Sequence, residues 1–258
     1  MPIFRTRDMT WTVRDEHLVH NTSVLKIVAE LAEAPEHAVL KNAGPRRLAV
    51  KRFTDDAGQV REAVWKEYQY PGRLAQLGQL VRASRARREW QILNALHDRR
   101  LPVPEPIAFG ELRRAGVVRL QVVLMERLAQ TTALHDLATD YRNGATCFRA
   151  RAAKRRFIEQ LGAFIGHAHQ AGLQHADLHA GNILVHLGDL PRFYLIDLHR
   201  GKMRAQVSHA ARIAGLAQFH VFFSTWASRA DRLRFLAAYR QATPSADSLR
   251  AMTADVER

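Results

Sequence analysis

The chain has 258 residues, of which 47% are hydrophobic and 25% are charged. This length and composition are typical of a folded protein with one large domain or two lobes, and they exclude a disordered chain. The single cysteine, Cys147, excludes an internal disulfide and a zinc site built from several thiolates. The charged amino terminus and the lack of a long apolar run favour a cytoplasmic protein without signal peptide or membrane span.

The formal net charge is +14, which favours binding to polyanions such as nucleic acid, an anionic membrane surface, phosphorylated substrates or acidic proteins. Basic residues gather in three stretches, 82–90, 149–156 and 199–204. The alternative is an arginine-rich protein with a well solvated surface, but the third stretch lies beside the candidate chemistry described below, which favours an anionic substrate. The aromatic residues, 8% of the chain, do not alternate with the basic stretches, so a specific nucleic-acid interface is not expected.

The first 60 residues are predicted to form mainly short strands. Residues 38–53 predict a hairpin around an Asn-Ala-Gly-Pro turn. A polar, helix-prone connection is expected next, followed by a helix over 84–98 with apolar residues at helical spacing. The prolines of 101–106 end that helix, and 117–125 predicts a strand.

The second half predicts a long helix over 150–171 that ends at Gly172. Two apolar runs, 182–187 and 192–198, predict a second hairpin, and the chain from about 205 onward is helical in character. Strands with one helix followed by mostly helices predict an α+β fold of two lobes, 1–127 and 128–258.

Candidate chemistry lies at the second hairpin. Asn182 precedes its first strand and Asp197 follows its second, so both residues are expected at the same end. An amide oxygen and a carboxylate there suit Mg²⁺ that also holds phosphate. Asp177, in the preceding loop, can accept a proton from a substrate hydroxyl.

Two charged residues occupy apolar surroundings in the first half. Lys51 lies within the strand-like "LAVKRF", and Glu89 lies on the apolar face of the 84–98 helix. An unpaired charge would be costly in either place, so we expect the two to form an ion pair. A paired lysine can contact nucleotide phosphates.

From about 36 to 240 the sequence resembles bacterial lipopolysaccharide-core kinases of the Kdo/heptose kinase family, which are protein-kinase-like. The resemblance rests on "AVKRF", "REWQILNALHDRRLPVPEPIAFGE", "HADLHAGNILV" and "FYLIDLHRGKM". The loop around Asp177 is also similar to that of aminoglycoside-type kinases. The resemblance implies a two-lobed protein-kinase-like fold that transfers a phosphoryl group from ATP, with Mg²⁺, to a heptose or Kdo hydroxyl of the lipopolysaccharide inner core.

The resemblance also implies roles for individual residues. Lys51 would hold the α- and β-phosphates with Glu89 orienting it, while Asn182 and Asp197 would bind Mg²⁺. The remaining expected positions are Asp177 and His179 for catalysis, Glu126 and Leu128 beside the adenine, and His199, Arg200 and Lys202 for the acceptor.

Some features depart from the kinase pattern. No Gly-x-Gly-x-x-Gly motif is present, and the stretch 22–40, expected to cover the phosphates, contains no glycine. The usual Asp-Phe-Gly reads Asp197-Leu198-His199, and no Ala-Pro-Glu segment follows, which disfavours a peptide substrate. The expected partners are an anionic glycolipid, the anionic face of the inner membrane, where the enzyme would bind peripherally, and an acidic protein.

Three other functions compete with this hypothesis. His167, His169, His175 and His179, with Asp177, suggest a metal hydrolase, although helix and loop geometry keep them from converging. An aminoglycoside phosphotransferase shares the catalytic loop, but its cationic substrates match a basic chain poorly. The last competitor is a basic nucleic-acid- or membrane-binding protein with an inactive kinase-like fold.

Overall fold

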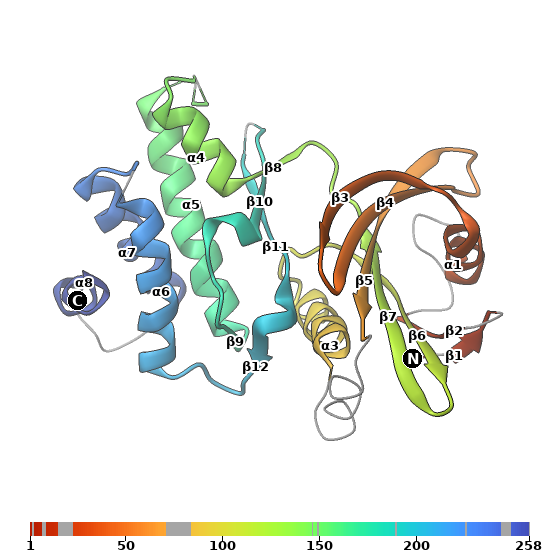
Figure 1. Cartoon of the computed structure of the whole chain (residues 1–258). Helices are drawn as coiled ribbons and strands as arrows, with labels where there is room; N and C mark the ends of the chain where they lie inside the picture. Colours follow the sequence, from red (N-terminus) through yellow and green to blue (C-terminus); the bar gives the residue numbers. More distant parts are fainter. Residues whose placement is uncertain are drawn as a thin grey trace. The chain divides into compact units, whose positions relative to one another are not determined.

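The computed structural model describes residues 1, 3–6, 9–14, 23–70, 84–145, 147–148, 150–188, 190–224, 226–243 and 249–257. The chain folds into two compact units (Figure 1). Unit 1 contains Met1–Asn94 and Pro104–Leu128, and unit 2 contains Ala95–Val103 and Ala129–Arg258. Unit 1 thus ends one residue after the expected boundary at 127, whereas the placement of Ala95–Val103 in unit 2 was not predicted. Parts of the basic stretches 82–90 and 149–156 lie outside the described residues.

Unit 1 is built on a seven-stranded antiparallel sheet with the order β1-β2-β6-β7-β5-β4-β3. Its strands are β1 (Ile3–Arg5), β2 (Met9–Val13), β3 (Glu36–Ala43), β4 (Arg46–Thr54), β5 (Val60–Gln69), β6 (Pro106–Arg114) and β7 (Val117–Glu126). The β3–β4 hairpin and β7 confirm the strands predicted over 38–53 and 117–125.

Two elements of unit 1 differ from the prediction. Helix α1 (Val24–Glu33) occupies a region predicted as strand, and its buried Val24, Ile27, Val28 and Leu31 form one helical stripe in the core of the unit. Strand β5 replaces the predicted helix-prone connection. It pairs with β4 on one side and β7 on the other, so it is a central strand despite its charged residues.

Helix α3 (Arg85–Asp98) confirms the predicted helix, and its residues from Ala95 onward belong to unit 2. The other helices of unit 2 are α4 (Leu134–Arg142), α5 (Arg151–Gln170), α6 (His209–Phe223), α7 (Arg229–Ala242) and α8 (Leu249–Glu257). Helix α5 ends at Gln170, and Gly172, just beyond its C-cap Ala171, has a φ of +85°, the left-handed conformation that glycine favours after a helix.

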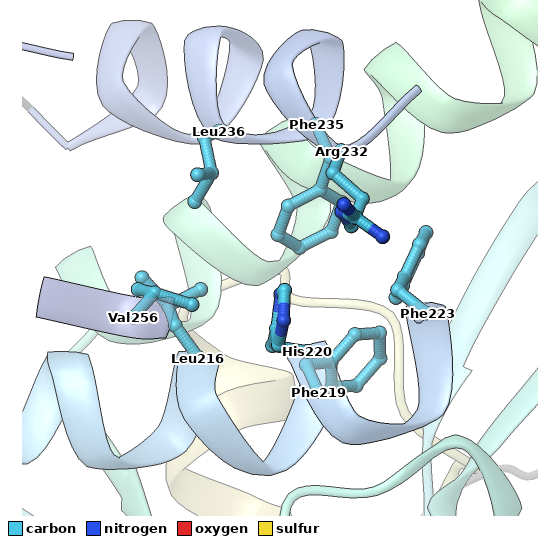
Figure 2. Close-up of a pocket in the computed structure, with 8 residues that line it drawn as sticks. All are labelled: Leu216, Phe219, His220, Phe223, Arg232, Phe235, Leu236 and Val256. Carbon is cyan, nitrogen blue, oxygen red and sulfur yellow. The ribbon is translucent and has the colours of Figure 1, made fainter. Parts of the chain in front are cut away.

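Helix α5 packs closely on α7 because two glycines face the α7 backbone. A Cβ at Gly162 would lie 2.3 Å from the Phe235 carbonyl oxygen, and one at Gly166 would lie 2.9 Å from that of Tyr239. On the other side of α7, Phe235 stacks on Phe219 of α6 with ring centroids 5.8 Å apart. Both rings line a small apolar cavity of about 20 Å³ between α6, α7 and α8 (Figure 2).

Two small sheets complete unit 2. One has the strand order β11-β10-β8, and the other pairs β12 with β9. Their strands are β8 (Thr131–Ala133), β9 (Leu173–His175), β10 (Ile183–His186), β11 (Arg192–Leu195) and β12 (Gly201–Met203). The β10–β11 pair confirms the predicted second hairpin. Among the described residues, no helix is long and apolar enough to cross a bilayer.

Candidate active site

The base of the β10–β11 hairpin brings Asn182 and Asp197 to one end, as predicted. Ile183 pairs with Leu195, and the Ile196 N–H donates to the Asn182 carbonyl over 3.0 Å. Asn182 forms the last residue of a short 3-10 helix, η1 (Ala180–Asn182), and its side chain is buried. The amide nitrogen of Asn182 donates to the Asp177 carbonyl over 2.9 Å, which orients its amide oxygen.

Asp197 adopts a left-handed conformation, with φ of 57° and ψ of 48°. This conformation is costly for a residue other than glycine and is typical of functional sites. Two buried histidines contact Asp197. His199 Nδ1 lies 2.6 Å from its Oδ1, and His175 Nε2 lies 3.3 Å from its carbonyl oxygen. Asp197 is therefore held through both its carboxylate and its backbone.

His175 also fixes the loop that carries Asp177. Its Nδ1 accepts from the Asp177 N–H over 3.1 Å, so the ring proton is on Nε2, which donates to the Asp197 carbonyl. Burial lowers the pKa of the His175 imidazole, and this favours the neutral ring that the two contacts require. His175 thus links Asp177 and Asp197 as a structural residue.

Gln218 of α6 holds the same loop from the other side. Its Oε1 accepts from the Leu178 N–H over 3.0 Å, and its Nε2 donates to the Ala176 carbonyl over 3.2 Å. The side chain therefore clamps the backbone on both sides of Asp177. Gln218 was not predicted from the sequence, because a glutamine about 40 residues from the loop carries no local signal of this contact.

Two basic side chains surround the Asp177 carboxylate. Arg200 forms an ion pair with its Oδ2 at 3.2 Å, and His179 Nε2 lies 3.9 Å from its Oδ1. His179 Nδ1 accepts from the Gly181 N–H, which orients the ring. The Asp177 side chain remains 33% exposed, so a substrate can approach it. Lys202 is exposed on β12.

In unit 1 the expected ion pair of Lys51 with Glu89 is wrong. Glu89 instead forms a buried ion pair with Lys66 of β5, whose Nζ lies 2.7 Å from Glu89 Oε1. The Tyr68 hydroxyl donates to the other carboxylate oxygen over 2.5 Å. Lys66 and Tyr68 lie two positions apart on one face of β5 and meet α3 together.

Lys51 has a different environment within the same unit. Its Nζ donates to the Leu31 carbonyl at the end of α1 over 2.7 Å and lies 4.2 Å from the centre of the Trp65 ring. Burial lowers the pKa of the Lys51 ammonium. The lysine is therefore satisfied by a helix terminus and an aromatic face, and it needs no carboxylate partner.

The segment that precedes the paired lysine, Lys66, also differs from the expectation. The expected cover, 22–40, contains α1 and the start of β3. The hairpin directly before β5 is β3–β4, and its turn contains Gly44 with φ of +55°. Glu126 closes β7, and its N–H donates to the Glu105 carbonyl over 2.9 Å; Leu128 ends unit 1.

The histidine-rich segment does not form a metal cluster. Among the described residues, no group of three or more His, Cys, Asp or Glu side chains could hold a metal ion. On α5, His167 is exposed whereas His169 is buried with its Nδ1 2.7 Å from the Tyr239 hydroxyl, so the two rings face different surroundings. The metal-hydrolase hypothesis therefore has no support in the described part.

A family model described as lipopolysaccharide kinase (Kdo/WaaP) matches residues 58–239, more than half of the chain. The chain belongs to the lipopolysaccharide kinase (Kdo/WaaP) family. Lys66, Glu89, Asp177, Asn182 and Asp197 all lie within the matched range, whereas Lys51 lies outside it.

Two relatives illustrate the similarity of this family member. It is 31% identical over 163 residues to the lipopolysaccharide core heptose(I) kinase WaaP of Pseudomonas aeruginosa, covering 60% of the chain and 59% of the relative. It is 38% identical over 116 residues to the 3-deoxy-D-manno-octulosonic acid kinase of Xylella fastidiosa (strain M23), covering 45% and 41%. The chain thus spans about two to three fifths of the length of these relatives.

Solved structures share the fold of this family member. The structure of WaaP in complex with acyl carrier protein matches with a TM-score of 0.64 at 24% identity, over 90% of both chains. The ROP18 kinase domain in complex with AMP-PNP and sucrose matches with a TM-score of 0.54 at 13% identity, over 93% of this chain and 90% of that domain. The expected protein-kinase-like α+β fold is confirmed.

Proposed function

We propose that this family member transfers a phosphoryl group from ATP to a sugar hydroxyl, of heptose or Kdo, in the lipopolysaccharide inner core. The arrangement around Asp177 carries the proposal, because this partly exposed carboxylate lies on a loop that His175 and Asn182 connect to the Asp197 segment. The two relatives, one a heptose kinase and one a Kdo kinase, support a core sugar as acceptor.

Asp177 would accept the proton of the attacking hydroxyl, since its carboxylate is partly exposed and already fixed by its neighbours. The Arg200 guanidinium and the His179 Nε2–H lie beside this carboxylate, where both can attract the phosphate being transferred. Arg200 would exchange its contact with Asp177 for the acceptor or for phosphate, and Lys202, exposed on the next strand, would extend the acceptor site.

The donor set fits Mg²⁺, because an oriented amide oxygen on Asn182 and a carboxylate on Asp197 are hard oxygen ligands. When bound, this ion neutralises charge on the nucleotide phosphates. His199 is buried against Asp197, so we assign it to orienting that ligand and no longer to contacting the acceptor.

Lys66 replaces Lys51 as the lysine that contacts the α- and β-phosphates, because it is the one that Glu89 orients. The β3–β4 hairpin would then cover the phosphates, with Gly44 at its turn. Glu126 and Leu128 retain their expected place beside the adenine, through backbone groups.

Turnover of Mg·ATP against a panel of core-truncated lipopolysaccharides tests the proposal. Transfer is expected to a heptose- or Kdo-terminated acceptor, with no transfer to an aminoglycoside. Asp177→Asn and Asp197→Asn should each lose at least a thousandfold in kcat/KM, while the exposed Asp140→Asn on α4 serves as the matched control. Normal turnover in both site variants would contradict the mechanism, and transfer to the aminoglycoside alone would contradict the acceptor.

We further propose that the enzyme works at the cytoplasmic face of the inner membrane, bound peripherally through its positive charge. The net charge of +14 supports attraction to an anionic leaflet and an anionic glycolipid. A protein partner is also proposed, since WaaP was solved in complex with acyl carrier protein. Pull-down with purified acyl carrier protein at low and high salt tests this partner, and equal recovery by beads without that protein would refute it.

A further inference from the structure

The turn between β10 and β11 exposes large apolar side chains. Leu187 is 44% exposed and Leu190 is 61% exposed, and Pro191 follows Leu190 in the sequence. Leucines with this exposure are individually unremarkable on a protein surface, but here two occur in one tight turn. The turn extends from the β10–β11 hairpin of unit 2 (Figure 1).

Two cavities flank this turn and share Pro191 as a wall. One, of about 510 Å³, is lined by Arg156, Leu187 and Gly188, and the other, of about 580 Å³, is lined by Arg99, Arg100 and Arg192. The α5 residues that line them recur at helical spacing and therefore share one face of that helix, namely Ala153, Arg156, Phe157, Gln160, Ala163, Phe164 and His167. The cavities thus form one continuous surface along α5.

The charge of this surface is of one sign. Among the described residues, the two linings contain the four arginines Arg99, Arg100, Arg156 and Arg192 and no carboxylate. Asp189, in the turn by sequence, lies outside the described residues. A guanidinium cluster around an apolar floor suits an amphiphile with anionic phosphates better than a purely polar anion.

Arg100 has an unusual backbone conformation at one edge of this surface. It follows α3 with φ of 57°, the position and conformation that helix ends usually give to glycine. The Arg100 N–H donates to the His97 carbonyl and the Leu101 N–H to the Leu96 carbonyl, which is the hydrogen-bond pattern of such an end. Glycine suits this backbone conformation better than arginine, so the Arg100 side chain can be removed without disturbing the helix end.

We propose that this surface, comprising Arg99, Arg100, Arg156, Leu187, Leu190 and Arg192, binds the anionic face of a lipid bilayer. The arginines contact headgroup phosphates, and the two leucines enter the boundary between headgroups and acyl chains. The inference deepens the proposed function, on whose peripheral membrane location it rests, by naming the residues that carry it. Nucleic acid is disfavoured as the ligand because exposed leucines would contribute nothing to the binding of a sugar-phosphate backbone.

Binding to vesicles of phosphatidylcholine with and without phosphatidylglycerol tests the surface, measured by co-sedimentation. The triple variant Arg99→Ser/Arg100→Gly/Arg192→Ser should bind the anionic vesicles about 100-fold more weakly, since each arginine near such a surface contributes about fivefold. Its charge-matched control is Arg119→Ser/Arg229→Ser/Arg250→Ser, which should lose less than about threefold. Equal loss in the two variants would mean that net charge alone attracts the protein, and this would overturn the proposal.

The leucines are tested by Leu187→Ser/Leu190→Ser, with Val221→Ser on α6 as the exposed apolar control. The double variant should bind about tenfold more weakly, and the remaining binding should disappear at high salt. If the leucine substitutions left vesicle binding unchanged, the proposed insertion of this turn into the bilayer would be wrong. Wild-type protein that ignores vesicles but binds polyglutamate through the three arginines would identify an acidic protein partner instead.

The single variant Arg100→Gly separates binding from folding. Glycine relieves the left-handed strain, so the variant should melt no lower than the wild type while binding anionic vesicles about fivefold more weakly. Turnover of a water-soluble, deacylated acceptor should be unchanged in every variant of this surface. Loss of vesicle binding with normal turnover of the water-soluble acceptor would support the proposed membrane-binding surface. Absence of turnover in the wild type would refute only the proposed reaction.

Discussion

Lys66 and Glu89 form a buried ion pair, with Nζ and Oε1 2.7 Å apart, and it joins a central strand of the unit 1 sheet to α3. The Tyr68 hydroxyl completes the coordination of the same carboxylate. The pair leaves Lys51, which the sequence favoured for this role, bound to the Leu31 carbonyl and the Trp65 ring. The proposed phosphate-binding role of Lys66 and the packing role of Lys51 can therefore be tested separately.

Substituting each lysine by methionine distinguishes these functions. Lys66→Met should abolish phosphoryl transfer and, because it leaves Glu89 as an unpaired buried charge, should lower the free energy of unfolding by about 3 kcal/mol. Lys51→Met should cost about 1 to 2 kcal/mol, the loss of a hydrogen bond and a cation–π contact, while kcat stays within about twofold. Urea unfolding and initial rates measure both effects. Loss of activity in Lys51→Met but not in Lys66→Met would reverse the assignment.

The contact between His199 and Asp197 predicts a positioning effect on metal binding. His199→Ala should weaken Mn²⁺ binding, measured by electron paramagnetic resonance, by about 10- to 100-fold, because the carboxylate loses the group that orients it. His199→Asn should restore much of the affinity, since the asparagine amide can donate from about the same place as Nδ1. A purely packing role for His199 would show as unchanged Mn²⁺ affinity in the folded alanine variant.

Much of the Asp177 site was predictable from sequence because its members are close together along the chain. Asn182 and Asp197 flank a hairpin whose apolar strands are clearly marked, so their approach follows from strand pairing alone. The lysine was misassigned because "VREAVWKEYQ" carries four charges in ten positions and suggests an exposed helix, whereas it is central in the sheet and its Lys66 is buried against Glu89. The usable signal was Lys66 and Tyr68 on one face, directly before the helix that carries Glu89.

The contact between His169 and Tyr239 was not predictable because it depends on how α5 packs on α7. Nothing at either position marks a partner 70 residues away, and the close approach of the helices comes from glycines that the sequence shows only as gaps in the apolar stripe. Side-chain contacts between distant helices require the tertiary arrangement, which local periodicity does not contain.

The burial of His169 should make the free energy of unfolding depend on pH. It lowers the pKa of His169 to about 4, with Arg212 adding to the effect, against 6.5 for an ordinary histidine. The unfolded chain therefore binds the proton first as pH falls, so this contribution to stability is complete above pH 6.5 and is lost between pH 6.5 and 4. The shift corresponds to about 3 kcal/mol.

Chemical unfolding at a series of pH values, with wild type and His169→Gln, measures this dependence. Glutamine can keep a hydrogen bond to the Tyr239 hydroxyl but does not titrate, so the variant should show a shallower decline between pH 6.5 and 4. His167→Gln is the matched control, because His167 is exposed on the same helix. Parallel pH profiles for wild type and His169→Gln would show that other groups carry the decline.

The packing of α5 on α7 predicts unequal effects of adding one methyl group to two helical glycines. Gly162→Ala places a Cβ 2.3 Å from the Phe235 carbonyl oxygen, so the helices must separate, and we expect a loss of about 2 to 3 kcal/mol. Gly215→Ala on α6 is the control. Its Cβ finds its nearest neighbour, His169 Nε2, at 3.5 Å, and alanine favours the helix, so stability should be unchanged or rise by up to about 1 kcal/mol. Thermal unfolding monitored by circular dichroism compares the two, and equal stability of both variants would show that α5 and α7 tolerate a wider separation than this packing implies.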